Sequence, residues 1–166
     1  MKSPLFDTEI GKLAQQLGQT MLRRGAKITV AESCTGGGIA EAITAVPGSS
    51  QWFEYGFVTY ANQAKQDLLD VDNQLLLDQG AVSQPVVEQM ASGAIKVSKA
   101  DYAIAVSGIA GPGGGTETKP VGTVWICWLR PNNNFSQQYL FDGDRNAIRK
   151  QVIKISLQEL LHQITE

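Results

Sequence analysis

The segment from Asp101 to Ser107 constrains the fold most, because it is apolar at successive positions rather than at alternate ones. A strand with one face in water alternates apolar and polar residues, whereas a strand covered on both faces reads as a continuous apolar run. The sequence DYAIAVS therefore predicts a central strand with helices on both sides of its sheet. A chain of 166 residues, 43% of them apolar, can bury such a strand within one domain, which we expect to span 1–166.

Amphipathic segments and β-branched runs alternate along the rest of the chain. Apolar residues recur at helical spacing from Thr8 to Arg24, with Asp7 or Thr8 as the N-cap and Gly25 as the terminator. The remaining expected elements are a strand at 27–31, a helix at 35–45, a strand at 54–60, helices at 62–69, 73–79 and 83–97, a strand hairpin at 121–129 and 135–141 around the turn 131–134, and a helix at 144–164. This order predicts an α/β domain, layered α/β/α, with a mixed sheet.

Composition and charge exclude several classes of function. The net charge is −2 and the basic residues are scattered, which argues against a nucleic acid or a membrane surface as partner. No apolar run approaches the roughly 18 residues of a membrane span, and the N-terminus lacks a signal-peptide pattern. Two cysteines and one histidine make neither a disulfide framework nor a metal cluster. We expect a soluble, cytoplasmic protein that acts on a small molecule and holds no metal.

The segment 29–38, TVAESCTGGG, is the expected working centre of the chain. A short strand gives way there to a hydroxyl, a thiol and three glycines, so Ser33 and Cys34 should be exposed at the edge of the sheet. We expect Thr35, Gly36 and Gly37 to offer backbone N–H groups at a helix N-terminus. This arrangement indicates a nucleophile beside an anion site.

A nucleophilic serine needs a base, and the sequence offers few. The only histidine, His162, lies four residues from the C-terminus and is a poor member of a triad. Lysine can replace histidine when burial lowers its pKa, and Lys65 is our candidate, with Tyr60 at the preceding junction of strand and helix. Equally, Lys65 can be a solvated helix residue and Ser33 a turn former. Cys34 is a rival nucleophile, or else a small buried apolar residue.

Two further segments are candidates for substrate contact. After Ser107 the chain runs through fifteen residues, 108–122, with six glycines and two prolines, a length that favours a functional loop. We assign substrate contacts to Ser107 and to three glycines of this loop, Gly108, Gly111 and Gly113.

Arg145 and Arg149 lie one turn apart at the start of the final helix. Paired guanidinium groups beside helix N–H groups can hold a phosphate. The alternative is a pair of surface contacts with Asp142 and Asp144.

Six ordered motifs give the chain a resemblance to a known family, the CinA C-terminal domain family, and in it to the stand-alone nicotinamide-nucleotide amidases. The motifs are AESCTGG (31–37), GFVTYANQAK (56–65), GAVSQPVV (80–87), SGIAGPGGG (107–115), KPVGTVW (119–125) and GDRNAIR (143–149). Ala61 stands where the family usually has serine or threonine, and Gly114 stands at a position that is often acidic in the family.

The resemblance implies hydrolysis of nicotinamide mononucleotide to nicotinate mononucleotide and ammonia, in the recycling of pyridine nucleotides, with no metal and no organic cofactor. The serine, tyrosine and lysine of the family fall on Ser33, Tyr60 and Lys65. They imply attack by Ser33, proton transfer to Lys65, and relay or orientation by Tyr60. The competing hypothesis is a catalytically silent paralogue that binds a nucleotide as a sensor. Aromatic residues at the strand edges favour a homodimer.

Overall fold

A computed structural model describes residues 8–165 of the chain. Its helices are α1 (Glu9–Arg24), α2 (Gly38–Thr44), α3 (Asn62–Leu69), α4 (Asn73–Gln79), α5 (Gln84–Ser98) and α6 (Arg145–Thr165), with a short 3-10 turn η1 at Ser49–Gln51. The strands are β1 (Ile28–Glu32), β2 (Phe53–Val58), β3 (Tyr102–Gly108), β4 (Thr123–Arg130) and β5 (Asn133–Leu140).

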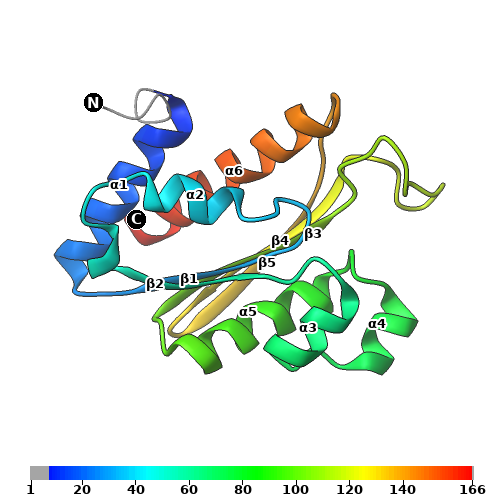
Figure 1. Ribbon diagram of the computed structural model, residues 1–166, viewed down its shortest axis with the longest axis horizontal. Helices are drawn as coiled ribbons and strands as arrows, with labels where there is room; N and C mark the ends of the chain where they lie inside the picture. The colour runs from blue at the N-terminus through cyan, green and yellow to red at the C-terminus, as the bar shows by residue number, and fades with distance from the viewer. Residues whose placement is uncertain (1–7, 166) are drawn as a thin grey trace.

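The five strands form one mixed sheet in the order β2-β1-β3-β4-β5. Strands β2 and β3 run parallel to β1, whereas β4 and β5 form the antiparallel part. Helices α1, α2 and α6 cover one face and α3, α4 and α5 cover the other (Figure 1). The predicted α/β/α layering and the mixed sheet are therefore confirmed.

The apolar character of the central strands explains this layering. All five residues of β1 are buried, as are the first six of β3. Alternate residues of each strand enter two separate cores: Ile104 and Val106 of β3 pack with α1, α2 and α6, while Ala103 and Ala105 pack with α5. A strand apolar on both faces needs such a cover on each side.

Two local predictions need correction. Helix α2 begins at Gly38 instead of Thr35, because Gly36 and Gly37 have φ angles of +58° and +98°, which a right-handed helix does not accommodate. The hairpin turn is shorter than the predicted 131–134, since Arg130 already pairs with Asn133 across the ladder. Pro131 and Asn132 alone connect the two strands.

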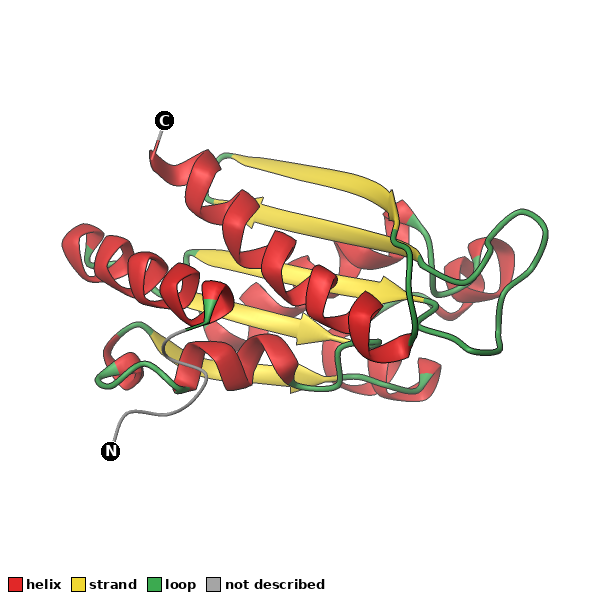
Figure 2. Ribbon diagram, turned by 90° about the horizontal axis from the view of Figure 1, so that it is seen from above, coloured by secondary structure: helices red, strands yellow, loops and turns green. Residues whose placement is uncertain are grey.

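The topology fixes where a ligand site can form. Strand β1 connects to β2 across one face, and β2 connects to β3 across the other, so the chain reverses its direction of winding between β1 and β3. Ligands of open α/β sheets bind at such a switch point, beyond the carboxyl ends of the strands. The arrows of β1, β2 and β3 all point to the end of the sheet from which the long loop projects (Figure 2).

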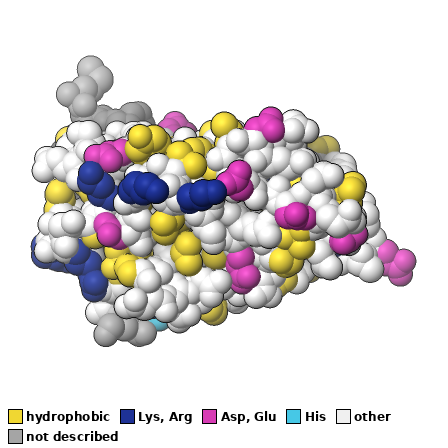
Figure 3. Space-filling view, turned by 90° about the horizontal axis from the view of Figure 1, so that it is seen from below, with side chains coloured by type: hydrophobic (Ala, Val, Ile, Leu, Met, Phe, Trp, Pro, Cys, Tyr) yellow, Lys and Arg dark blue, Asp and Glu magenta, His cyan; other side chains and the backbone are white. Residues whose placement is uncertain are grey.

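The face formed by α3, α4 and α5 carries charges of both signs. Figure 3 shows Lys and Arg side chains toward one end of this face, with Asp and Glu side chains among them and over the rest. Lys96 of α5 pairs here with Asp70, the residue that follows α3, at 2.5 Å. Among the helices of residues 8–165, none is long and apolar enough to cross a membrane.

Candidate active site

Ser33 occupies the first position after β1, at the switch point of the sheet. Its backbone N–H donates to the carbonyl of Val106 in β3 over 3.1 Å, which extends the ladder by one residue. Its own carbonyl accepts from Gly36 N–H, which closes a tight turn between β1 and α2. The side chain is 8% exposed. Ser33 is thus held on both sides by backbone hydrogen bonds while its hydroxyl reaches a pocket.

The buried carboxylate of Glu32, the last residue of β1, anchors this turn. Its oxygens accept hydrogen bonds from the Thr35 hydroxyl and from the N–H groups of Gly37, Ile39 and Ala40, at distances between 2.5 and 3.2 Å. Glu32 is fully buried, and a buried carboxylate needs such partners. The N-terminus of α2 is therefore already occupied by an anion of the protein itself.

This finding corrects the prediction that Thr35, Gly36 and Gly37 present N–H groups to a substrate. Gly36 donates to Ser33 and Gly37 donates to Glu32, so neither N–H is free for a ligand. None of the three residues lines the pocket that contains Ser33. The glycines instead provide the positive φ angles that the turn requires.

Lys65 reaches Ser33 from α3, on the opposite face of the sheet from α2. Its Nζ lies 3.1 Å from Ser33 Oγ and donates to the backbone carbonyls of Thr59 at 2.9 Å and Tyr60 at 3.4 Å. The residue is 1% exposed, and within residues 8–165 no carboxylate lies within ion-pairing distance of it. Burial lowers the pKa of the Lys65 amine below its ordinary value. Lys65 is a buried contact of Ser33 rather than a solvated helix residue.

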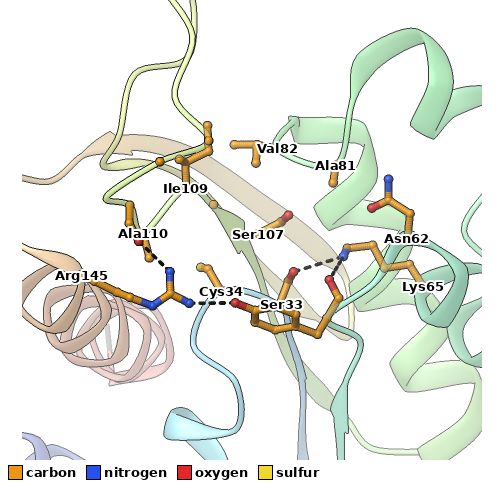
Figure 4. A pocket seen from close by; sticks show the side chains of 15 residues that line it. Ser33, Cys34, Asn62, Lys65, Ala81, Val82, Ser107, Ile109, Ala110 and Arg145 are labelled. Carbon is orange, nitrogen blue, oxygen red and sulfur yellow. Dashed lines mark hydrogen bonds between the residues drawn. The ribbon is translucent and has the colours of Figure 1, made fainter.

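Tyr60 lies between β2 and α3, and the residue is 58% exposed. Its hydroxyl accepts a hydrogen bond of 2.8 Å from Arg145 Nη2, and its backbone carbonyl is the part that contacts Lys65. The second terminal nitrogen of Arg145 donates to the carbonyl of Gly111 at 2.7 Å. Figure 4 shows Lys65 and Arg145 on opposite sides of Ser33.

The two arginines of α6 do not form one site. Arg145 lines the Ser33 pocket, but Arg149 donates to the Thr35 carbonyl at 2.9 Å and lines a separate hollow between α2 and α6. Neither forms an ion pair with Asp142 or Asp144 among the described residues, and Asp144 caps α6 through the N–H of Ala147. Only Arg145 remains placed to meet a ligand in this pocket.

The pocket has a volume of about 290 Å³ and brings most of the predicted site residues together. Those that line it are Ser33, Tyr60, Lys65, Ser107, Gly108, Gly111, Gly113 and Arg145. Sequence reasoning did not select the other lining residues, which are Asn62 at the start of α3, Ala81 and Val82 between α4 and α5, and Ile109, Ala110 and Gly114 after β3. These residues lie within the motifs quoted for the family, but no single motif indicates that they share a pocket, because the segments meet only through the packing of the fold.

The glycine-rich loop after β3 is tied to helices on both faces of the sheet. Arg145 of α6 holds Gly111, and Lys119 Nζ donates to the carbonyl of Gln79 at the end of α4 over 2.7 Å. Gly111 has a φ of +79°, and a Cβ there would lie 2.5 Å from the side chain of Val121. Glycine is thus required at this position, and the loop forms a fixed wall of the pocket.

Cys34 and His162 do not compete for the role of nucleophile or base. Burial raises the pKa of the Cys34 thiol to about 12, which disfavours the thiolate that a nucleophilic cysteine needs. His162 is exposed near the end of α6 and does not line the pocket. Within residues 8–165, no group of three or more His, Cys, Asp or Glu side chains could hold a metal ion.

Comparison with known proteins gives full-length matches. The family model described as the CinA C-terminal domain matches residues 10–164. The nicotinamide-nucleotide amidohydrolase PncC of Escherichia coli (strain K12) is 49% identical over 163 residues, 98% of this chain and 99% of the relative. The protein with the same description from Pseudomonas putida is 54% identical over 157 residues, 95% of this chain and 98% of the relative.

A solved structure has the same fold. The crystal structure of the competence/damage inducible protein CihA from Agrobacterium tumefaciens superposes with a TM-score of 0.93 and 41% sequence identity, covering 99% of this chain and all of that chain. Because the superposition covers nearly the whole chain, the elements that carry Ser33, Lys65 and Arg145 have corresponding elements in that structure.

Proposed function

The chain belongs to the CinA C-terminal domain family, and we propose that it is an amidohydrolase that converts nicotinamide mononucleotide to nicotinate mononucleotide and ammonia. Near-full-length relatives described as nicotinamide-nucleotide amidohydrolases support the substrate and the reaction. The observation that carries the proposal is the 3.1 Å contact between Ser33 Oγ and the buried amine of Lys65, which is an activated nucleophile with its base.

The two carbonyl contacts of Lys65 support its role as a general base. A neutral amine has two N–H bonds and one lone pair. When its two hydrogens point to the carbonyls of Thr59 and Tyr60, the lone pair points to the Ser33 hydroxyl. Burial favours this neutral form. The backbone at the end of β2 thus orients the base toward the nucleophile.

The proposed reaction proceeds in two halves. Ser33 Oγ attacks the carboxamide carbon while its proton moves to Lys65, and Lys65 then protonates the leaving nitrogen so that ammonia departs. The resulting ester on Ser33 is hydrolysed by water, which gives its proton to Lys65. Lys65 returns this proton to Ser33 Oγ as the ester C–O bond breaks, and the product acid loses its remaining proton to solvent and leaves as a carboxylate. Because Thr35, Gly36 and Gly37 do not line the pocket, we assign the oxyanion to the backbone N–H of Cys34, which follows Ser33 and does line it.

Arg145 supports a substrate with an anionic group. It is a permanent cation at the edge of the pocket that meets no carboxylate in residues 8–165. The 5′-phosphate of a mononucleotide is a suitable partner for it. We therefore propose that Arg145 binds the phosphate and that the carboxamide enters toward Ser33, in a reaction that recycles pyridine nucleotides.

The setting of the enzyme is part of the same proposal. We propose a single amidase domain over 1–166 that acts in the cytoplasm, where the two free, buried cysteines stay reduced. The edge strand β2 exposes Tyr55 and Val58, which supports a homodimer formed along that edge.

Release of ammonia from nicotinamide mononucleotide by the purified protein tests the function directly. Turnover by the wild-type protein and its loss in Ser33→Ala would support an amidohydrolase. Binding of the nucleotide without release of ammonia would instead identify a silent binding protein.

A further inference from the structure

The hydroxyl of Tyr60 is directed to Arg145 and not to the base. It lies 2.8 Å from Arg145 Nη2, whereas Lys65 Nζ contacts only the backbone carbonyl of Tyr60. A relay of the Ser33 proton would need the hydroxyl within hydrogen-bond reach of Ser33 or Lys65. Among the described residues, neither Ser33 nor Lys65 forms a hydrogen bond with the Tyr60 hydroxyl.

We propose that Tyr60 is a substrate-binding residue whose hydroxyl forms, together with Arg145, the site for the phosphate of the substrate. The inference rests on the proposed function, since it takes the substrate to be a mononucleotide. The two parts of Tyr60 then have different tasks. Its carbonyl orients Lys65, and its side chain distinguishes a phosphorylated substrate from the riboside.

The hydrogen-bonding capacity of the pair fits an anion. Arg145 donates to the oxygen of the Tyr60 hydroxyl, so the hydroxyl proton itself stays available as a donor. Guanidinium has five N–H donors, and the contacts with Tyr60 and Gly111 use two of them. Both groups line the same pocket, and no carboxylate of residues 8–165 neutralises the arginine. A phosphate can therefore accept from both side chains at once.

The exposure of Tyr60 supports the same assignment. The residue is 58% exposed, in contrast to the 1% of Lys65, so it lies toward the mouth of the pocket. A proton relay works best away from bulk water, whereas a phosphate enters from it. Tyr60 and Arg145 are 85 residues apart in sequence, Tyr60 between β2 and α3 and Arg145 at the start of α6, and both line the pocket.

Steady-state kinetics of Tyr60→Phe separate the two roles. We expect the preference for nicotinamide mononucleotide over nicotinamide riboside, as a ratio of kcat/KM values, to fall about tenfold, mainly through a higher KM, with the pH profile unchanged. In an Arg145→Ala background the same change should have a smaller effect, because both groups act on one phosphate. Tyr139→Phe, at a half-buried tyrosine of β5 outside the pocket, is the matched control.

Equal losses of kcat on both substrates, with a shifted pH profile, would establish the relay and overturn the proposal. An unchanged preference in Tyr60→Phe would overturn it as well. The melting temperature of each variant identifies any effect that comes from folding alone.

Calorimetry on the Ser33→Ala variant separates this proposal from the proposed function. Without the nucleophile, binding is measured apart from chemistry, and nicotinamide mononucleotide should bind more tightly than the riboside by a margin that Tyr60→Phe reduces. If the wild-type protein releases no ammonia, the proposed hydrolysis is wrong. The phosphate site would still be supported if the difference in affinity between mononucleotide and riboside depends on Tyr60. A margin that does not depend on Tyr60 would refute the site even in an active enzyme.

Discussion

The two sides of Ser33 hold one basic residue each, in opposite environments. Lys65 is 1% exposed and is surrounded by backbone carbonyls, whereas Arg145 lies at the pocket edge beside the exposed Tyr60. Burial lowers the pKa of the Lys65 amine, which suits the proposed base, whereas a guanidinium keeps its charge, which suits the proposed binding of an anion. We propose that one pocket combines proton transfer by the buried Lys65 with phosphate recognition by the exposed Arg145.

The largest loss of activity is expected when Ser33, the proposed nucleophile, is removed. Ser33→Ala should lower kcat/KM for nicotinamide mononucleotide by more than about a thousandfold, measured as ammonia release. Cys34→Ala is the matched control, since the neighbouring thiol has its pKa raised to about 12 by burial and should be dispensable. A loss of activity confined to Cys34→Ala would show a cysteine amidase.

The second prediction concerns the protonation of Lys65. Lys65→Arg should lower kcat by about a hundredfold or more, because guanidinium cannot accept the proton of Ser33. In the wild type, kcat/KM should rise with pH as the amine loses its proton and then level off. Because burial lowers the pKa of Lys65, the midpoint should fall below the ordinary value of about 10.4. Full activity of Lys65→Arg would reduce Lys65 to an electrostatic role.

The third prediction separates the two arginines of α6. Arg145→Ala should lower kcat/KM for the mononucleotide by about ten- to a hundredfold, with a much smaller effect on the riboside, because only the former carries a phosphate. Arg149→Ala should affect both substrates alike, since Arg149 holds the carbonyl of Thr35 behind the turn. Substrate-selective loss in Arg149→Ala and not in Arg145→Ala would move the phosphate site.

The fourth prediction concerns the anchor of the Ser33 turn. Glu32→Gln keeps the shape of the side chain but places an amide NH2 group among N–H donors, so the free energy of unfolding should fall by about 2–4 kcal/mol. Urea denaturation measures this change. Activity at a temperature where the variant is folded should fall about tenfold because Ser33 loses its position. Glu41→Gln, on the exposed side of α2, is the control and should change neither quantity.

The fold could be predicted because its signals are local. The run from Asp101 to Ser107 indicates a strand with two covered faces, and the Pro131 turn indicates a hairpin, so the mixed sheet follows from short segments. The sequence pattern predicts the start of α2 three residues too early, because it does not separate the glycines after Thr35 from the helix that follows. The turn that they form includes a hydrogen bond from Gly37 to the buried carboxylate of Glu32, which local sequence does not indicate.

The candidate site was predictable where strand ends carry reactive side chains. Ser33 follows β1, Ser107 lies near the end of β3, and Lys65 comes a few residues after β2. These three strands are parallel, so the topology brings the three side chains to one edge of the sheet. The contacts that join residues distant in sequence could not be predicted. The partners of Tyr60 and Arg149 lie 85 and 114 residues away, and their hydrogen bonds depend on how α6 packs across the sheet.

Trapping the acyl-enzyme tests the central claim, attack by Ser33 on the carboxamide, most directly. Acid quenching of the wild-type protein during turnover of nicotinamide mononucleotide, followed by peptide mass spectrometry, should find the nicotinate mononucleotide acyl group as an ester on Ser33. The adduct should be absent from Ser33→Ala. An adduct on Cys34, or continued release of ammonia by Ser33→Ala, would contradict the account.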